Sequence, residues 1–191
     1  MIRPPGWCWC LPLAHAPVTG LGAWADGAAR LLLEPTDLLL AIALVLLALQ
    51  HGPRTLERLW WRVPAGWLAG ALVGVALPRE LLVAPLLSAA LTALALLVSF
   101  RIPLPPRALL ALLPLGAAGF AVVSGSAMAG HSGGLAVVLA EALTLGLVTG
   151  LLASALALLR VGWGPIAIQV AGSWIAATAL LLLGWQLRHP S

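Results

Sequence analysis

The fold is decided by the first of several long apolar runs, TDLLLAIALVLLALQ, at residues 36–50. Asp37 opens this run, and no further Asp, Glu, Lys or Arg follows until Arg54. The whole chain of 191 residues is 62% hydrophobic and only 8% charged. A soluble domain of this size carries about 25% charged residues, which cover its surface. A surface in contact with hydrocarbon needs no such charge. The sequence therefore predicts an integral membrane protein.

The rest of the chain repeats this pattern as apolar segments separated by short gaps. In lipid, only a helix satisfies the backbone hydrogen bonds within one such segment, and the alternating strand pattern of a β-barrel is absent from the sequence. The sequence therefore predicts an all-α fold, a polytopic membrane helix bundle with about six transmembrane helices. We expect Leu31–Leu33 to extend the first helix. The expected segments are residues 35–50, 60–77, 81–100, 108–123, 135–159 and 163–187.

The first residues have the pattern of a secretory targeting segment. Arg3 gives a positive start, an apolar stretch runs to Leu13, and Ala14-His15-Ala16 ends it with small residues. Cleavage after Ala16 or after Ala14 fits this pattern, and the second would leave His15 as an N-terminal residue with a chelating amine and imidazole. We therefore expect a signal segment at residues 1–16, an outer N-terminal region at 17–34 and a transmembrane domain at 35–191.

Basic residues set the expected orientation in the membrane. The formal net charge is +4, but the arginines lie singly or in small groups at segment ends, which argues against a nucleic-acid-binding surface. Cytoplasmic loops are enriched in arginine, and most arginines lie in the gaps after the first, third and fifth segments. We therefore expect a multi-pass protein of the inner (cytoplasmic) membrane with both termini on the outer side. The arginines of these gaps are Arg54, Arg58, Arg62, Arg101, Arg107 and Arg160.

Glycines recur at four-residue spacing in two of the segments. Gly66, Gly70 and Gly74 lie in the second segment, and Gly146 and Gly150 lie in the fifth. This spacing places the glycines of a segment on one helix face, where a neighbouring helix can approach closely. The sequence therefore predicts tight helix packing and not a wide water-filled pore.

A few polar groups lie at membrane depth, or next to it, on the expected outer side. Asp37 begins the first segment, Glu141 lies inside the fifth, and Met128 and His131 precede the fifth. An ionisable residue within a membrane helix is costly and indicates a functional site. Together with His15, these groups are candidate ligands for a divalent transition metal.

Each of these residues also has a purely structural interpretation. Asp37 suits the first turn of a helix, where a carboxylate is favoured by the helix dipole. His131 suits a solvated loop. Glu141 lies more than one turn inside an apolar helix, so that it needs a partner, and the candidates are Thr144, Ser173 or a water-filled cleft.

The sequence offers no catalytic constellation. Ser124, Ser126 and His131 fall in what the sequence predicts to be one glycine-rich loop, whereas an intramembrane serine protease needs its serine and histidine on different membrane helices. The chain also contains no phosphate-binding loop and no zinc-protease motif. We therefore expect no enzymatic activity and no resident cofactor.

Several short stretches occur in an order that is similar to that of a known family. They are Thr19-Gly20-Leu21-Gly22 with Asp26-Gly27, Pro35-Thr36-Asp37-Leu38-Leu39, Ala76-Leu77-Pro78 and Phe120-Ala121. With these stretches and its six segments, the chain resembles the HupE/UreJ family from about His15 to Leu187. Members of that family are hydrogenase or urease accessory membrane proteins regarded as nickel permeases. The resemblance therefore implies a transition-metal permease, with nickel or another divalent metal as the transported ion.

The chain departs from the histidine pattern of that family. Members carry an Asp-His pair at the first span, and here Leu38 follows Asp37 in place of the histidine. They carry a His-Gly-x-Ala-His element after the fourth span, and here Ser124 and Met128 stand at the two histidine positions. His131 lies three residues beyond. Imidazole is a better nickel ligand than a hydroxyl or a thioether, and the thioether favours copper.

Two functions of different classes follow from these observations. The first is a permease for a divalent transition metal. The alternative is a non-transporting accessory or assembly subunit of a larger membrane complex, which the missing histidines and the glycine-lined helices favour. The expected partners are the lipid bilayer and either another membrane protein or a second copy of the chain.

Overall fold

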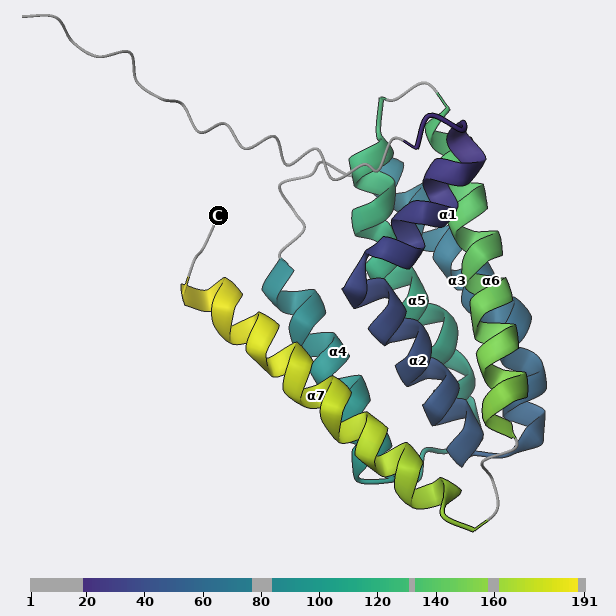
Figure 1. The fold of residues 1–191 in the computed structure, drawn as a ribbon, viewed down its shortest axis with the longest axis vertical. Helices are drawn as coiled ribbons and strands as arrows, with labels where there is room; N and C mark the ends of the chain where they lie inside the picture. The colour runs from purple at the N-terminus through teal and green to yellow at the C-terminus, as the bar shows by residue number, and fades with distance from the viewer. Residues whose placement is uncertain (1–18, 77–83, 131–132, 158–161, 189–191) are drawn as a thin grey trace, which may run out of the picture.

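In the computed structural model, residues 19–76, 84–130, 133–157 and 162–188 are described, and this part of the chain forms seven α-helices (Figure 1). The all-α prediction is therefore confirmed. The helices are α1 (Ala23–Leu33), α2 (Pro35–Gln50), α3 (Pro53–Ala76), α4 (Ala84–Ser99), α5 (Pro106–Met128), α6 (Gly134–Ala157) and α7 (Gly164–Arg188). The six predicted segments correspond to α2 through α7.

The helix α1 was not predicted, and the expectation that Leu31–Leu33 extends the first segment is wrong. These residues form the last turn of α1, and α1 and α2 are bent by 73° at Glu34. Glu34 has extended backbone angles because it precedes Pro35, whose ring disfavours a helical conformation at the residue before it. Pro35 then occupies the first position of α2, where its missing N–H costs nothing.

Three of the described helices, α5, α6 and α7, are long and apolar enough to cross a membrane, by length and composition. The bent pair α1 and α2 makes a fourth candidate if it counts as one span. Helix α3 carries several charged residues near its start, and α4 has only 16 residues within the described part of the chain. The fold is therefore that of a multi-span membrane protein with three or four candidate spans, and the expected number of six stays a prediction.

The core of the molecule is built around α2. Every residue from Ala43 to Leu49 is buried, and so are Leu40 and Ala41. In Figure 1, α2 lies between the pair α4 and α7 on one side and α3, α5 and α6 on the other, and it contacts all five helices as well as α1. α2 is therefore an enclosed helix, although its sequence looks like that of a helix facing lipid.

The predicted close packing of glycines is confirmed for α3. A Cβ atom at Gly66, Gly70 or Gly74 would overlap the backbone of Pro114, Ala118 or Val122 on α5, respectively. The two backbones therefore touch along three turns. Gly146 is less tightly packed, because a Cβ there would lie 3.3 Å from the ring of Pro64. Gly150 differs from the prediction, since within the described residues no atom lies within 4 Å of a Cβ built at this position.

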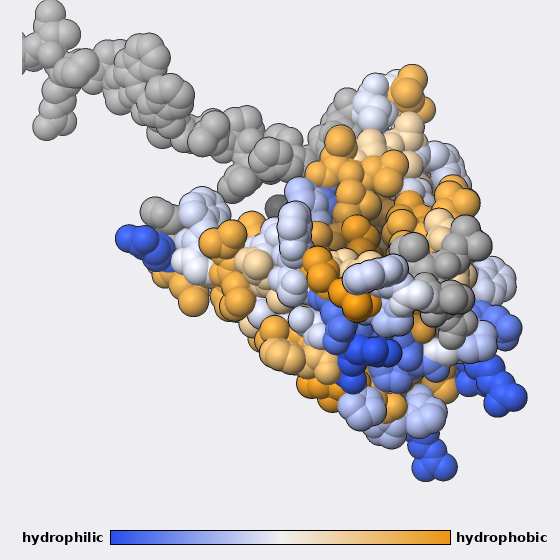
Figure 2. Space-filling model, turned by 60° about the horizontal axis from the view of Figure 1, so that its bottom comes forward, coloured by the Kyte–Doolittle hydropathy of each residue, from blue (hydrophilic) through white to orange (hydrophobic). Residues whose placement is uncertain are grey.

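Two of the loops in which the arginines were predicted to lie on the same side of the membrane, α2–α3 and α4–α5, are in contact with each other. The His51 side chain joins the α2–α3 and α4–α5 loops, because its Nε2 accepts a 3.2 Å hydrogen bond from the Leu104 N–H. These two loops carry or flank the arginines of the expected inner gaps, apart from Arg160, which lies outside the described residues. Figure 2 brings this end of the bundle forward and shows hydrophilic residues gathered there, beside the apolar sides of the helices.

Candidate functional site

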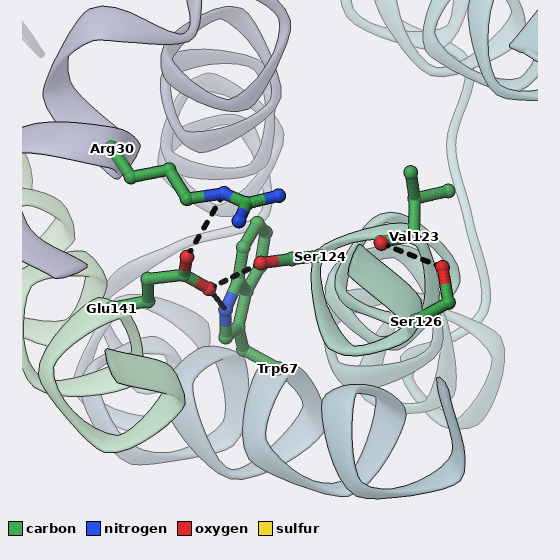
Figure 3. A network of polar contacts seen from close by, with 6 residues as sticks. All are labelled: Arg30, Trp67, Val123, Ser124, Ser126 and Glu141. Atoms are coloured by element: carbon green, nitrogen blue, oxygen red, sulfur yellow. Dashed lines mark hydrogen bonds and ion pairs between the residues drawn. The ribbon is translucent and has the colours of Figure 1, made fainter. Parts of the chain in front are cut away.

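Glu141 is the most deeply buried ionisable side chain among the described residues, with 1% of its surface exposed. It lies on α6 and points toward α5, α3 and α1 (Figure 3). Its Oε2 atom accepts a 2.5 Å hydrogen bond from the Ser124 hydroxyl of α5 and a 3.3 Å hydrogen bond from the Trp67 indole N–H of α3. Two donors on two helices therefore hold this carboxylate oxygen in place.

The other carboxylate oxygen of Glu141 faces a cation. Its Oε1 lies 3.3 Å from Nε of Arg30, whose side chain on α1 is 18% exposed. Arg30 approaches with Nε and not with its two terminal nitrogens (Figure 3). Oε1 has no partner at hydrogen-bond geometry within the described part of the chain. The ion pair is therefore weaker than a bidentate arginine–carboxylate pair, which has two parallel hydrogen bonds.

Two glycines bring these side chains together. A Cβ at Gly27 would overlap Val137 and Ala140, so that α1 lies directly on α6 one turn before Arg30. A Cβ at Gly125 would overlap the Ala71 backbone, so that α5 lies directly on α3 beside Ser124. The sequence prediction placed Ser124 and Ser126 in a loop, and this is wrong because α5 continues to Met128.

Asp37 lies near this site, at the third helical position of α2, and is partly buried. It is close enough to Glu141, Glu34 and Arg30 to interact electrostatically with each of them. Glu34 also accepts a 3.0 Å hydrogen bond from the Thr36 hydroxyl. Glu34, Glu141 and Arg30 thus lie within electrostatic range of Asp37, and Glu141 is the carboxylate paired with Arg30. We call Arg30, Glu34, Asp37 and Glu141 the acidic cluster.

Met128 is not part of the acidic cluster. It is buried at the end of α5, where its carbonyl oxygen would lie 2.8 Å from a Cβ at Gly134, the first residue of α6. Gly134 precedes Glu141 by two helical turns, roughly 10 Å along the axis at 1.5 Å per residue. Met128 is not among the hydrogen-bond or ion-pair partners of Glu141 in the described residues, and a metal ion shared by the two stays a prediction. The other two predicted ligands, His15 and His131, lie outside the described residues.

The predicted partners of Glu141 were incorrect. Ser173 lies on the exposed side of α7, where its hydroxyl donates to the Val170 carbonyl. The actual partners are Ser124, Trp67 and Arg30, none of which the sequence suggested. The sequence held one weak indication of the pairing. Arg30 and Glu141 both lie next to apolar residues, and each of these charges needs a partner of opposite charge. Ser126 does not join them, since its hydroxyl donates to Val123 on the far side of α5 (Figure 3).

The described residues do not contain three histidine, cysteine, aspartate or glutamate side chains placed to hold one metal ion. What they offer is two carboxyl groups within electrostatic range of each other, Glu141 and Asp37, with the Ser124 hydroxyl hydrogen-bonded to Glu141. These are oxygen donors, and Arg30 supplies the positive charge. Such an arrangement can bind a cation or a proton in place of the guanidinium.

A second feature is an open apolar groove between α3 and α6, with a volume of about 630 Å³. One wall is made by Trp60, Trp61 and Pro64 of α3, and the floor carries Gly146 and Gly150 of α6. The uncovered Gly150 therefore lies in this groove.

Comparisons of the chain with protein-family models, with curated proteins and with solved structures gave no match.

Proposed function

We propose that this chain is a permease for a divalent cation and that the acidic cluster is its binding site. The observation that carries the proposal is the position of Glu141. Its Oε2 is held by two hydrogen bonds, while Oε1 faces a single weakly held cation. A buried carboxylate in a membrane protein marks an ion or proton pathway far more often than it serves packing alone.

The charge of the acidic cluster favours a cation as substrate. The cluster contains three carboxyl groups and one guanidinium, so that its formal charge is negative. Charges at membrane depth are poorly screened, and their attraction for a cation is correspondingly strong. The partial exposure of Arg30 and Asp37 supports access to the cluster at the bend between α1 and α2.

Two arguments bear on which ion is transported, and they favour different metals. The resemblance to the HupE/UreJ family implies nickel. The donors of the acidic cluster are all oxygens, and oxygen donors suit Mn²⁺ and Mg²⁺ better than nickel. Both kinds of ion belong in the test.

The first test measures cellular accumulation of nickel, cobalt, copper and manganese. Cells that make the chain are compared with cells that make Asp37→Asn at equal abundance in the membrane. We expect accumulation of one metal to fall at least about tenfold in the variant, because one carboxylate of the acidic cluster is lost. Asp26→Asn is the matched control, since Asp26 lies at the start of α1 and accepts hydrogen bonds only from Thr19 among the described residues. Equal accumulation in both variants would refute the proposal.

A second function, that of an accessory subunit, is supported by the α3–α6 groove. The other glycines at helix contacts are covered by a neighbouring helix, as Gly70 is by Ala118. Gly150 is open, and small residues on an exposed helix face suit close contact with another membrane helix. The groove would then receive a helix of a partner subunit.

For this second function we expect that Gly150→Leu releases a membrane partner that the unchanged protein retains in mild detergent. Gly119→Leu is the matched control, since Gly119 on α5 is equally open but lies outside the groove. A photo-crosslinker at position 147, where Leu147 also lines the groove, identifies the partner by mass spectrometry. Absence of any crosslinked product, or the same product with Gly150→Leu, would count against an accessory role.

A further inference from the structure

Arg30 and an incoming cation would compete for the same atom. Oε2 of Glu141 is occupied by Ser124 and Trp67, so that Oε1 is the oxygen left for a positive charge. At present Oε1 has the Arg30 Nε at 3.3 Å, without hydrogen-bond geometry to any group of the described residues. A cation can therefore bind Oε1 directly only after Arg30 has moved.

Glu34 is a second carboxylate close to Arg30 in sequence. Glu34 follows it by four residues, a spacing at which side chains of a helix lie on the same face. Glu34 is exposed and ends α1, where the chain bends by 73° into α2. Glu34, whose carboxylate now accepts a hydrogen bond from the Thr36 hydroxyl, is therefore the carboxyl group that could take over the guanidinium when Arg30 leaves Glu141.

We propose that Arg30 is the specificity-determining residue of this site, a tethered counter-ion that makes the acidic cluster selective for divalent over monovalent cations. This inference rests on the proposed permease function. The reason is electrostatic. When Na⁺ or K⁺ replaces the guanidinium at Oε1 of Glu141, the positive charge beside this oxygen stays the same. When a divalent cation replaces it, the positive charge there increases by one, and this charge is poorly screened. Only the second exchange gains attraction to compensate for moving Arg30.

The test uses the full chain, purified and placed in lipid vesicles, with Mn²⁺, Ni²⁺ and Na⁺ as the ions tested. Unchanged protein is expected to take up a divalent ion and to exclude Na⁺. In Arg30→Gln, we expect the KM for the divalent ion to fall about tenfold and Na⁺ uptake to appear, because the resident competitor is gone. Arg30→Lys keeps the charge and is expected to keep the exclusion of Na⁺. Arg188→Gln, at the exposed end of α7, is the control for loss of an arginine.

A structural role for Arg30 predicts a different pattern. Loss of divalent uptake in Arg30→Gln with Na⁺ still excluded, or an unchanged KM, would overturn the inference while the permease function stands. If Arg30→Gln does not fold, Arg30→Met keeps the apolar stem and replaces it in the same comparison. Binding is read independently as the rise of the melting temperature caused by each ion in detergent. Neither uptake nor stabilisation by any ion, in the unchanged protein and in the variants, would overturn the permease function and this inference together.

Discussion

Glu141→Gln is expected to abolish cation uptake while the protein stays folded in the membrane. The glutamine carbonyl can still accept hydrogen bonds from Ser124 and Trp67, so the side chain keeps its position. Its NH₂ group then takes the place of Oε1 and presents a donor to any cation. Loss of a charged acceptor costs roughly 2–3 kcal/mol, which corresponds to about 100-fold weaker binding.

Uptake in vesicles at equal protein content measures this effect. Glu57→Gln is the matched control, since Glu57 is an exposed glutamate on α3. Uptake that survives in Glu141→Gln would show that the buried carboxylate serves stability only.

The stability contribution of Glu141 is separable by a larger change. Glu141→Leu leaves Arg30, Ser124 and Trp67 without their acceptor, and breaking a buried ion pair in this way costs about 3–5 kcal/mol. The double variant Arg30→Leu with Glu141→Leu removes the unpaired charge, and most of that loss is expected to return. Cation uptake by the double variant is expected to remain absent.

Gly70→Ala is expected to lower the stability of the protein, although it adds only one methyl group. In an isolated helix, alanine is favoured over glycine by about 1 kcal/mol. At position 70 the added methyl group would overlap the backbone of Ala118, and backbone atoms cannot rotate away as a flexible side chain can. Overpacking of this kind costs about 1–3 kcal/mol, so the steric cost exceeds the gain in helix propensity.

The control for this prediction is Gly119→Ala on α5, where nothing lies within 4 Å of the added atom among the described residues. Gly119→Ala is expected to be neutral or stabilising. The nine tryptophans of the chain allow thermal unfolding in detergent to be followed by fluorescence. A melting temperature that rises for both variants would show that α3 and α5 are not in direct backbone contact.

The helices were predictable because each apolar segment is bounded by proline, glycine or charge. The end of α1 was missed although its cause was in the sequence, since Pro35 restricts Glu34 and so breaks the helix that Leu31–Leu33 would have extended. The glycines of α3 predicted a close neighbour, but nothing in their spacing named α5.

The acidic cluster was predictable only in part. Glu141 and Asp37 stood out because carboxylates are rare in apolar segments. Arg30, the ion-pair partner of Glu141, lies far from it in sequence and falls in the predicted outer N-terminal region. The side chains that meet Glu141 come from three other helices, and that meeting depends on which helices pack together. In a membrane protein the outer surface is as apolar as the core, so hydrophobicity does not reveal which face of a helix is buried.

The enclosed position of α2 bears on how the protein is made. Chains are synthesised from the N-terminus, so that α2 leaves the ribosome before the five helices α3 to α7 that come to surround it. Until those helices are made, α1 is the one described helix that can lie beside α2. The run from Leu38 to Leu49 is apolar all round, which suits this early stage as well as the finished bundle. Because this run has no polar stripe, α2 exposes no polar side chain of the run to lipid before the other helices pack against it.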